Sequence, residues 1–362
     1  MHLSDTPSPV EQPDLFFAAP LLDPDPADGW TDPSAWAAAE ACAGRALAEA
    51  AAAVARLDER LAGAGASRDG LALRLALDGA GRLLWAEGAR LRWEKLALAR
   101  HERLGVADAD SRVLARARWA VRRMLATAED LAVPSGVRAF LGLTDVSEFD
   151  VSEFDVSEFD GSEAGGSEAH GSDPFADLAD DLDVKGPDGV DLQDWCGAIR
   201  ADLHPLTRAA MGWHLWRAWG LTVPERLLEP AVAAGRLATE GQGASPALLV
   251  HPASGSGLDA AARLERWLAA ATDAAQAALA EIDRVRLWRE RAGMATDGLQ
   301  GRGAPALIGL LARLPVVSAK VISAELGVSG TQARHLMDRF DGLGLVREVT
   351  GHSRFRFWTA RV

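Results

Sequence analysis

The stretch AKVISAELGVSGTQARHLMDRF, residues 319–340, decides how the C-terminal part of this chain folds. A glycine, Gly327, follows a first run of helical spacing, and glycine tolerates the left-handed conformation that a sharp turn requires. Ser329 comes next, and its hydroxyl can cap a second helix. Ser323 is small, which allows that second helix to cross close over the first. The stretch therefore predicts a helix-turn-helix, with these apolar positions at its centre: Ile322, Leu326, Val328, Ala333 and Leu336.

The second helix of this pair would project its first side chains outward, and their types suit DNA. Hydroxyl, amide, guanidinium and imidazole groups hydrogen-bond to base edges or to phosphates. We expect the side chains that reach the major groove or its rim to be Ser329, Thr331, Gln332, Arg334 and His335.

The residues that flank this pair complete the order of a winged helix. An apolar helix is expected over Pro305–Leu314, and two short strands over Leu345–Val349 and Arg354–Trp358, joined by a turn that contains Gly351. Alternation would place the phenylalanines of the second strand on one face and its arginines on the other. From Gly301 onward nine Lys and Arg oppose four acids, so this unit is locally basic. The expected phosphate or minor-groove contacts are Arg339, His352, Arg354 and Arg356.

The charge of the whole chain hides this basic unit. The 362 residues carry a net charge of −14, which ordinarily argues against nucleic acid as a partner. Seventeen acids and one lysine between Thr144 and Asp194 account for −16 of it, so the rest of the chain is +2. This acidic segment contains VSEFD three times over, and a period of five matches neither a packed helix nor a strand.

The sequence predicts a mainly α-helical protein: a helical bundle body, a C-terminal winged helix-turn-helix and a long disordered acidic insertion. Apolar residues recur at helical spacing through most of the remaining chain. The expected divisions are a disordered Pro-rich arm at 1–31, a helical domain at 32–143, the insertion at 144–190, the second part of the helical domain with a long connecting helix at 191–293, a Gly-rich hinge at 294–303 and the winged helix at 304–362.

Several other classes of function find little support in the sequence. The two cysteines are far apart and form no CxxC pair, and His204 and His214 lack further ligands at metal-binding spacing, so no metal or cofactor is expected. The first basic residue is Arg45 and no apolar run reaches transmembrane length, so we expect a cytoplasmic protein without a membrane partner.

The segment Trp85–Trp93 has two interpretations. Glu87, Arg90 and Arg92 could line a small-ligand site. The interpretation that we favour is a helix end with solvated charges and two tryptophans in the core, since burial is the usual use of the indole ring.

The layout resembles uncharacterised bacterial proteins, often plasmid-borne, that carry a helical domain of unknown function before a C-terminal helix-turn-helix DNA-binding domain. The resemblance is carried by residues 77–91, 116–125, 202–221, 265–292 and the winged helix, and it implies DNA binding without an established activity. The winged helix is also similar to the one that ends many Fic proteins, which are nucleotidyl transferases. Their catalytic loop reads H-P-F-x-[DE]-G-N-G-[RK], whereas this chain has HPASGSG from His251, without the acid, the asparagine or the final basic residue.

From the sequence we therefore expect a non-enzymatic regulator that binds duplex DNA as a homodimer and acts in transcription or plasmid maintenance. A single winged helix buries little DNA surface, which is why two copies are expected. Whether the helical body binds a small-molecule effector is not indicated by the sequence. Two alternatives remain: a degenerate Fic-like transferase with His251 as its base, and a protein-interaction scaffold that uses the winged helix to meet a partner.

Overall fold

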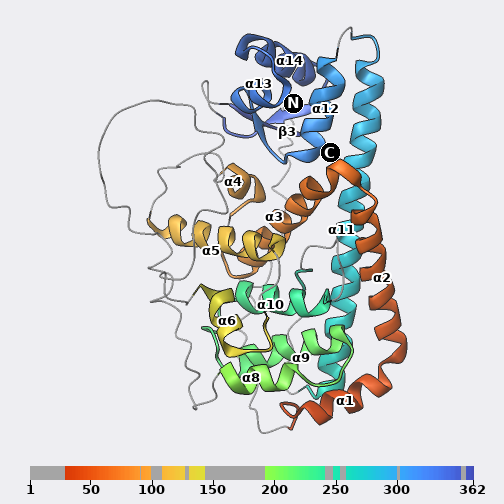
Figure 1. Ribbon diagram of the computed structural model, residues 1–362, viewed down its shortest axis with the longest axis vertical. Helices are drawn as coiled ribbons and strands as arrows, with labels where there is room; N and C mark the ends of the chain where they lie inside the picture. The colour runs from red at the N-terminus through yellow and green to blue at the C-terminus, as the bar shows by residue number, and fades with distance from the viewer. Residues whose placement is uncertain are drawn as a thin grey trace, which may run out of the picture.

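A computed structural model describes residues 29–89, 91–98, 108–126, 130–142, 192–240, 248–252, 258–299, 302–351 and 356–362. The fold is mainly helical, as the sequence predicts (Figure 1). The expected Pro-rich arm up to residue 28 and the acidic insertion at 144–190 lie outside the described residues. Among the described helices, none is both long and apolar enough to cross a bilayer.

The body is built around one long helix, α11, against which α1, α2, α3 and α9 pack, while α5, α8 and α10 pack on α3 and α9. Figure 1 shows α11 along the long axis of the molecule, with α2 beside it and α1 across one end. The helices of the body, in chain order, are α1 (Pro33–Cys42), α2 (Gly44–Ala62), α3 (Arg68–Ala86), α4 (Trp93–Leu98), α5 (Asp108–Leu125), α6 (Pro134–Leu141), α8 (Leu192–Ile199), α9 (Pro205–Ala218), α10 (Leu228–Ala238) and α11 (Ala260–Thr296), with a short 3₁₀ helix, η2 (Gly65–Ser67), before α3.

The helices of the body end at different kinds of residue. The first helical stretch is divided at Ala43 into α1 and α2. The helix α3 ends at Ala86, just before Gly88, which adopts a φ of 86°. In contrast, α11 continues through Gly293 to Thr296, because one glycine lowers helix propensity without preventing the helix.

The centre of the body is rich in tryptophan. Trp195, Trp213 and Trp216 are each at most 1% exposed, and Trp195 meets Trp216 edge to face at 5.2 Å. Buried indole groups also form hydrogen bonds with the backbone. Trp36 Nε1 donates to the carbonyl oxygen of Trp30 at 2.7 Å. Trp30 is itself 1% exposed, so the core begins just before the predicted end of the arm.

The interpretation of the Trp85–Trp93 segment as solvated charges beside two buried tryptophans is wrong for Trp85 and for Glu87. Trp85 is 59% exposed. Glu87 is buried, and its carboxylate accepts hydrogen bonds from the backbone N–H groups of Leu227 and Leu228 at 2.7 and 2.9 Å. This carboxylate satisfies free donors at the start of α10, which is why it can be buried.

Arg116 of α5 joins Glu87 to a second buried acid, Glu229 of α10. Its guanidinium lies 2.6 Å from a Glu87 oxygen and 2.7 Å from a Glu229 oxygen. Burial alone would lower the pKa of Arg116, but the two carboxylates outweigh it and raise that pKa above its ordinary value. The three side chains connect the end of α3 with α5 and α10, so this cluster stabilises the packing of these helices.

The winged helix rests directly on the body. Its elements, in chain order, are α12 (Gly303–Arg313), β1 (Val317–Ser318), α13 (Ala319–Leu326), α14 (Gly330–Gly342), β2 (Val346–Glu348) and β3 (Phe357–Ala360). Arg74 of α3 is 5% exposed and donates to the carbonyl oxygens of Leu311 and Leu314, at 2.6 and 3.0 Å. These carbonyls end α12, where a helix has no internal donors for them.

Two further contacts fix the orientation of the winged helix. Trp288 of α11 donates its indole N–H to the carbonyl oxygen of Leu345 at 2.8 Å, and Arg347 of β2 pairs with Glu94 of α4 at 2.6 Å. The helical and winged units therefore share a packed junction, although the sequence predicts a glycine-rich hinge between them.

Candidate nucleic-acid interface

The turn between α13 and α14 has the geometry that the sequence predicts. Gly327 adopts φ 64° and ψ 31°, the left-handed conformation that favours glycine. The hydroxyl of Ser323 donates to the carbonyl oxygen of Val328 at 2.5 Å, so this small residue also fastens the turn. Ser318 caps α13 by accepting from the N–H of Val321.

A capping box begins α14. The hydroxyl oxygen of Ser329 accepts from the backbone N–H of Gln332 at 3.2 Å, and the side-chain oxygen of Gln332 accepts from the N–H of Ser329 at 2.9 Å. The predicted capping role of Ser329 is confirmed. The side-chain carbonyl oxygen of Gln332 takes part in this cap, and its second lone pair can still accept a hydrogen bond.

The inner face of α14 holds it against α13 and the sheet. Ala333, Met337 and Phe340 are fully buried there, while Leu336 is half-buried. Ile322 of α13 is buried opposite them. Because this face is packed, the orientation of the opposite face is fixed relative to the rest of the molecule.

The outer face of α14 presents the predicted contacts to solvent. Thr331, Gln332, Arg334, His335 and Arg339 are all exposed. Within the described part of the chain, Arg334 and Arg339 have no side-chain hydrogen bond or ion pair. Figure 1 places α13 and α14 at the end of the molecule opposite α1 and α8, so nothing in the described body covers this face. The structure thus brings these five side chains onto one exposed helix.

The sheet of the winged helix has a strand that the sequence did not reveal. The antiparallel order is β1-β3-β2, with Val317 opposite Trp358 and Val346 opposite Ala360. The two-residue strand β1 is too short for a periodic signal, although Val316 and Val317 suit a strand. The strand order and the helix order together make a complete winged helix.

The second strand of the wing differs from its prediction. It was expected over Arg354–Trp358, whereas β3 runs from Phe357 to Ala360, and all four of its residues are buried. The predicted alternation of arginines and phenylalanines can be followed only at Arg356, which is half-buried, and Phe357, which is buried, because the two residues before them lie outside the described residues.

Part of the predicted wing contact can be placed. Arg356 is half-buried, and its guanidinium lies 5.1 Å from the centre of the Trp358 ring. The other two predicted wing contacts, His352 and Arg354, lie outside the described residues.

Glu348 shapes the start of the wing. Its carboxylate accepts from the backbone N–H groups of Thr350 and Gly351, at 2.7 and 2.9 Å, and from the Thr350 hydroxyl. Burial alone would raise the pKa of Glu348, but these hydrogen bonds and the charge of Arg356 lower it below its ordinary value. The carboxylate of Glu348 therefore stabilises the turn that begins the wing.

The remaining charges of the unit divide between structure and surface. Arg313 pairs with Glu325, and Arg347 pairs with Glu94, so these two arginines hold elements together. Lys320 of α13 and Arg302 before α12 are exposed at the surface. Counting basic residues along the sequence could not separate these two groups, because the partner of Arg347 lies more than 250 residues away.

The comparison with protein families agrees with this geometry. Residues 304–360 match the model of a family described as an HTH DNA binding domain. The matched residues span the six elements from α12 to β3. The comparison with curated proteins gives no match. The C-terminal unit is thus a winged helix-turn-helix of the DNA-binding class, and the helical body carries no such assignment.

Proposed function

We propose that this protein binds duplex DNA sequence-specifically, with α14 in the major groove and the wing on the neighbouring backbone. The observation that carries the proposal is the outer face of α14, where Arg334 and Arg339 are exposed and unpaired among the described residues. An unpaired arginine on a rigid helix can donate to two acceptors of a guanine, or to phosphate, without first losing a protein partner.

The binding experiment measures fluorescence anisotropy of DNA fragments from the region upstream of the coding sequence, against random competitor DNA, at two salt concentrations. We expect saturable, selective binding that weakens steeply as salt rises, because several phosphate contacts release counterions. Arg334→Ala should weaken selective binding by about 10- to 100-fold.

Arg45→Ala is the matched control. It removes the same charge from an exposed arginine on α2, whose partner among the described residues is Glu49. If Arg45→Ala weakens binding as much as Arg334→Ala, the effect is one of total charge and the proposed contact is wrong. If the unmodified protein binds no duplex at all, the scaffold interpretation takes its place.

We further propose that two copies act together, as a regulator of transcription or of plasmid maintenance. Support for this comes from the small surface that one winged helix offers to DNA, since paired half-sites are the common solution. Light scattering of the free protein and of its complex with DNA measures the number of copies. A complex that contains one copy at saturation contradicts this part of the proposal.

We propose that the protein acts by binding and not by catalysis. His251 does not occupy a loop that resembles a complete Fic motif, and its ring lies edge-on to Trp213 at 6.1 Å. Partial burial and the nearby charge of Arg217 lower the pKa of His251. His251→Ala should leave DNA affinity unchanged. A nucleotidyl-transfer activity that this substitution removes would favour the enzyme instead.

A further inference from the structure

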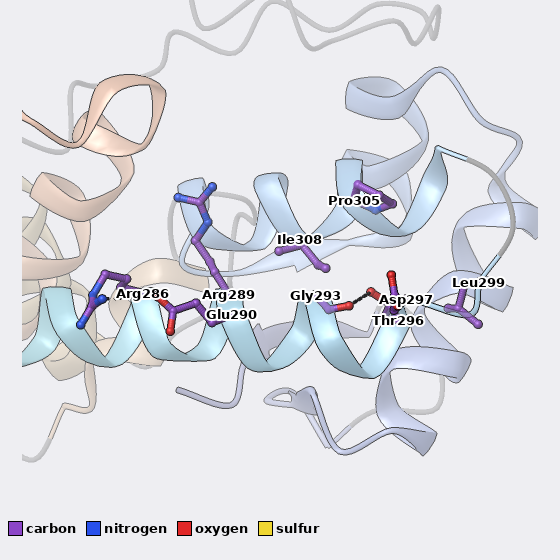
Figure 2. Close-up of a pocket in the computed structure, with 9 residues that line it drawn as sticks. All are labelled: Arg286, Arg289, Glu290, Gly293, Thr296, Asp297, Leu299, Pro305 and Ile308. Carbon is purple, nitrogen blue, oxygen red and sulfur yellow. Dashed lines mark hydrogen bonds and ion pairs between the residues drawn. The ribbon is translucent and has the colours of Figure 1, made fainter.

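A cleft of about 520 Å³ lies where the last turns of α11 face the start of α12. Figure 2 shows its residues in a row along α11, with those of α12 across from them. The α11 side is mostly polar, and the opposite side is apolar. The lining residues are Arg286, Arg289, Glu290, Gly293, Thr296, Asp297 and Leu299 on α11 and just after it, and Pro305 and Ile308 of α12 across the cleft.

The charges in the cleft are not equally available. Arg286 lies 3.3 Å from Glu290 and 3.6 Å from Asp283, so these charges are already paired. Arg289 has only a hydrogen bond of 3.3 Å to the Ser67 hydroxyl, and Asp297 has no ion pair within the described residues. One available positive charge and one available negative charge therefore stand in the same cleft.

These two charges are far apart. Arg289 and Asp297 are separated by eight residues of the chain, which correspond to roughly 12 Å along a helix axis. Figure 2 shows Arg289 toward the beginning of the row along α11 and Asp297 toward its end, near Leu299. The surface between them includes Pro305 and Ile308, which are apolar. A molecule that satisfies the whole cleft has an apolar body with a negative group at one end and a positive group at the other.

Gly293 lies midway between the two charges. It stands inside a helix, where glycine costs about 1 kcal/mol relative to alanine, and a Cβ at this position would meet nothing within 4 Å. Neither close packing nor a left-handed backbone explains this glycine, because its φ is not positive. The absence of a side chain here keeps the floor of the cleft open.

The cleft lies under one end of α12, and the other end is anchored. The C-terminal end of α12 is bound by Arg74, and a Cβ at Gly70 of α3 would come within 1.8 Å of the carbonyl oxygen of Arg313. At the N-terminal end, a Cβ at Gly303 would lie 3.4 Å from the side chain of Leu336 on α14. A ligand that moves the N-terminal end of α12 therefore pushes on the helix that carries Arg334.

We propose that this cleft binds an elongated small zwitterion, with its acidic group at Arg289 and its amino group at Asp297, and that binding weakens the interaction with DNA. The ligand part stands on the cleft alone, whereas the regulatory part rests on the proposed function. Typical couplings between two sites change affinity by about five- to 150-fold.

Calorimetry without DNA tests the ligand part on the full chain. The probes are 6-aminohexanoate and 8-aminooctanoate, and the controls are octanoate and octylamine, which each lack one charge. We expect at least one zwitterion to bind at least tenfold more tightly than either control. Asp297→Asn should reduce its affinity to that of octanoate.

Gly293→Leu and Gly293→Ala test the location. Both substitutions favour the helix, so the variants should fold, and their side chains enter the cleft. Leucine should abolish zwitterion binding and alanine should weaken it. If neither zwitterion binds better than the controls, or if Gly293→Leu binds the zwitterion like the unmodified protein, the proposed site is wrong.

DNA affinity with and without the bound zwitterion tests the regulation. We expect a loss of about fivefold or more, and no loss in Gly293→Leu. Zwitterion binding with unchanged DNA affinity would overturn the regulatory part and keep the site. A protein that binds the zwitterion but never binds DNA would instead contradict the proposed function.

Discussion

Arg74 and Arg334 are both helical arginines, but they serve opposite ends of the same unit. Arg74 lies at the junction with the body, is 5% exposed and donates to two carbonyl oxygens of α12. Burial lowers its pKa to about 10, although the charge of Glu281 opposes this. Arg334 lies on α14, is exposed and has no side-chain partner among the described residues.

This difference separates an arginine that holds the fold together from one that the proposed function assigns to DNA. At the junction, Arg74 donates to backbone carbonyl oxygens of α12, and removing its side chain leaves these carbonyl groups without that hydrogen-bond donor. On α14, the exposed arginines have no partner among the described residues. Removing one should therefore change DNA binding without changing the stability of the fold. The junction also makes the orientation of α14 depend on α3 and α11.

The largest expected effect is at the junction. Gly70→Ala places a Cβ 1.8 Å from a backbone oxygen of Arg313, so α3 and α12 must separate. We expect it to destabilise the protein by at least about 3 kcal/mol in urea unfolding. Gly309→Ala on α12 is the control, because its Cβ meets nothing within 4 Å, and it should be neutral or slightly stabilising. Equal stability of the two variants would contradict the tight junction.

Arg74→Gln should have the next largest effect. It removes two hydrogen bonds from a charged donor and leaves the last carbonyls of α12 without that partner, a loss of about 2 kcal/mol. Arg82→Gln on the same helix removes an exposed pair with Asp78 and should cost less than about 0.5 kcal/mol. Comparable losses in the two variants would show that the junction is not set by Arg74.

The sequence predicted the helix-turn-helix of α13 and α14 better than it predicted the junction with the body. Gly327 and Ser329 predict the turn and the cap because both act within a few residues, and α14 follows from its own periodicity. The role of Arg74 depends on carbonyls more than 230 residues away, and that of Gly70 on a close approach between two helices. Such contacts between residues far apart in the chain leave no local pattern in the sequence.

A third prediction concerns pH and the buried charges of the body. Burial, together with Arg263 and Arg217, holds the pKa of His214 well below its usual range. Below about pH 6.5 the unfolded chain binds a proton at this histidine that the folded protein does not, so stability is full above that pH and falls as pH decreases, by up to about 1.4 kcal/mol per unit. Urea unfolding between pH 7 and pH 5 measures the slope, and His214→Phe should reduce it. Parallel curves for the two proteins would refute this.

The smallest expected effect lies at the start of α14, and it distinguishes capping from DNA contact. Ser329→Ala removes the cap and should cost about 1 kcal/mol of stability. Ser329→Asp keeps a side-chain acceptor for the N–H of Gln332 and should retain the stability, but it adds a negative charge at the end of α14 that we place against DNA. We therefore expect Ser329→Asp to weaken DNA binding in anisotropy measurements while its urea midpoint stays unchanged. If Ser329→Asp binds DNA as well as the unmodified protein does, the start of α14 does not face the phosphates. The proposed orientation of α14 on DNA would then be wrong.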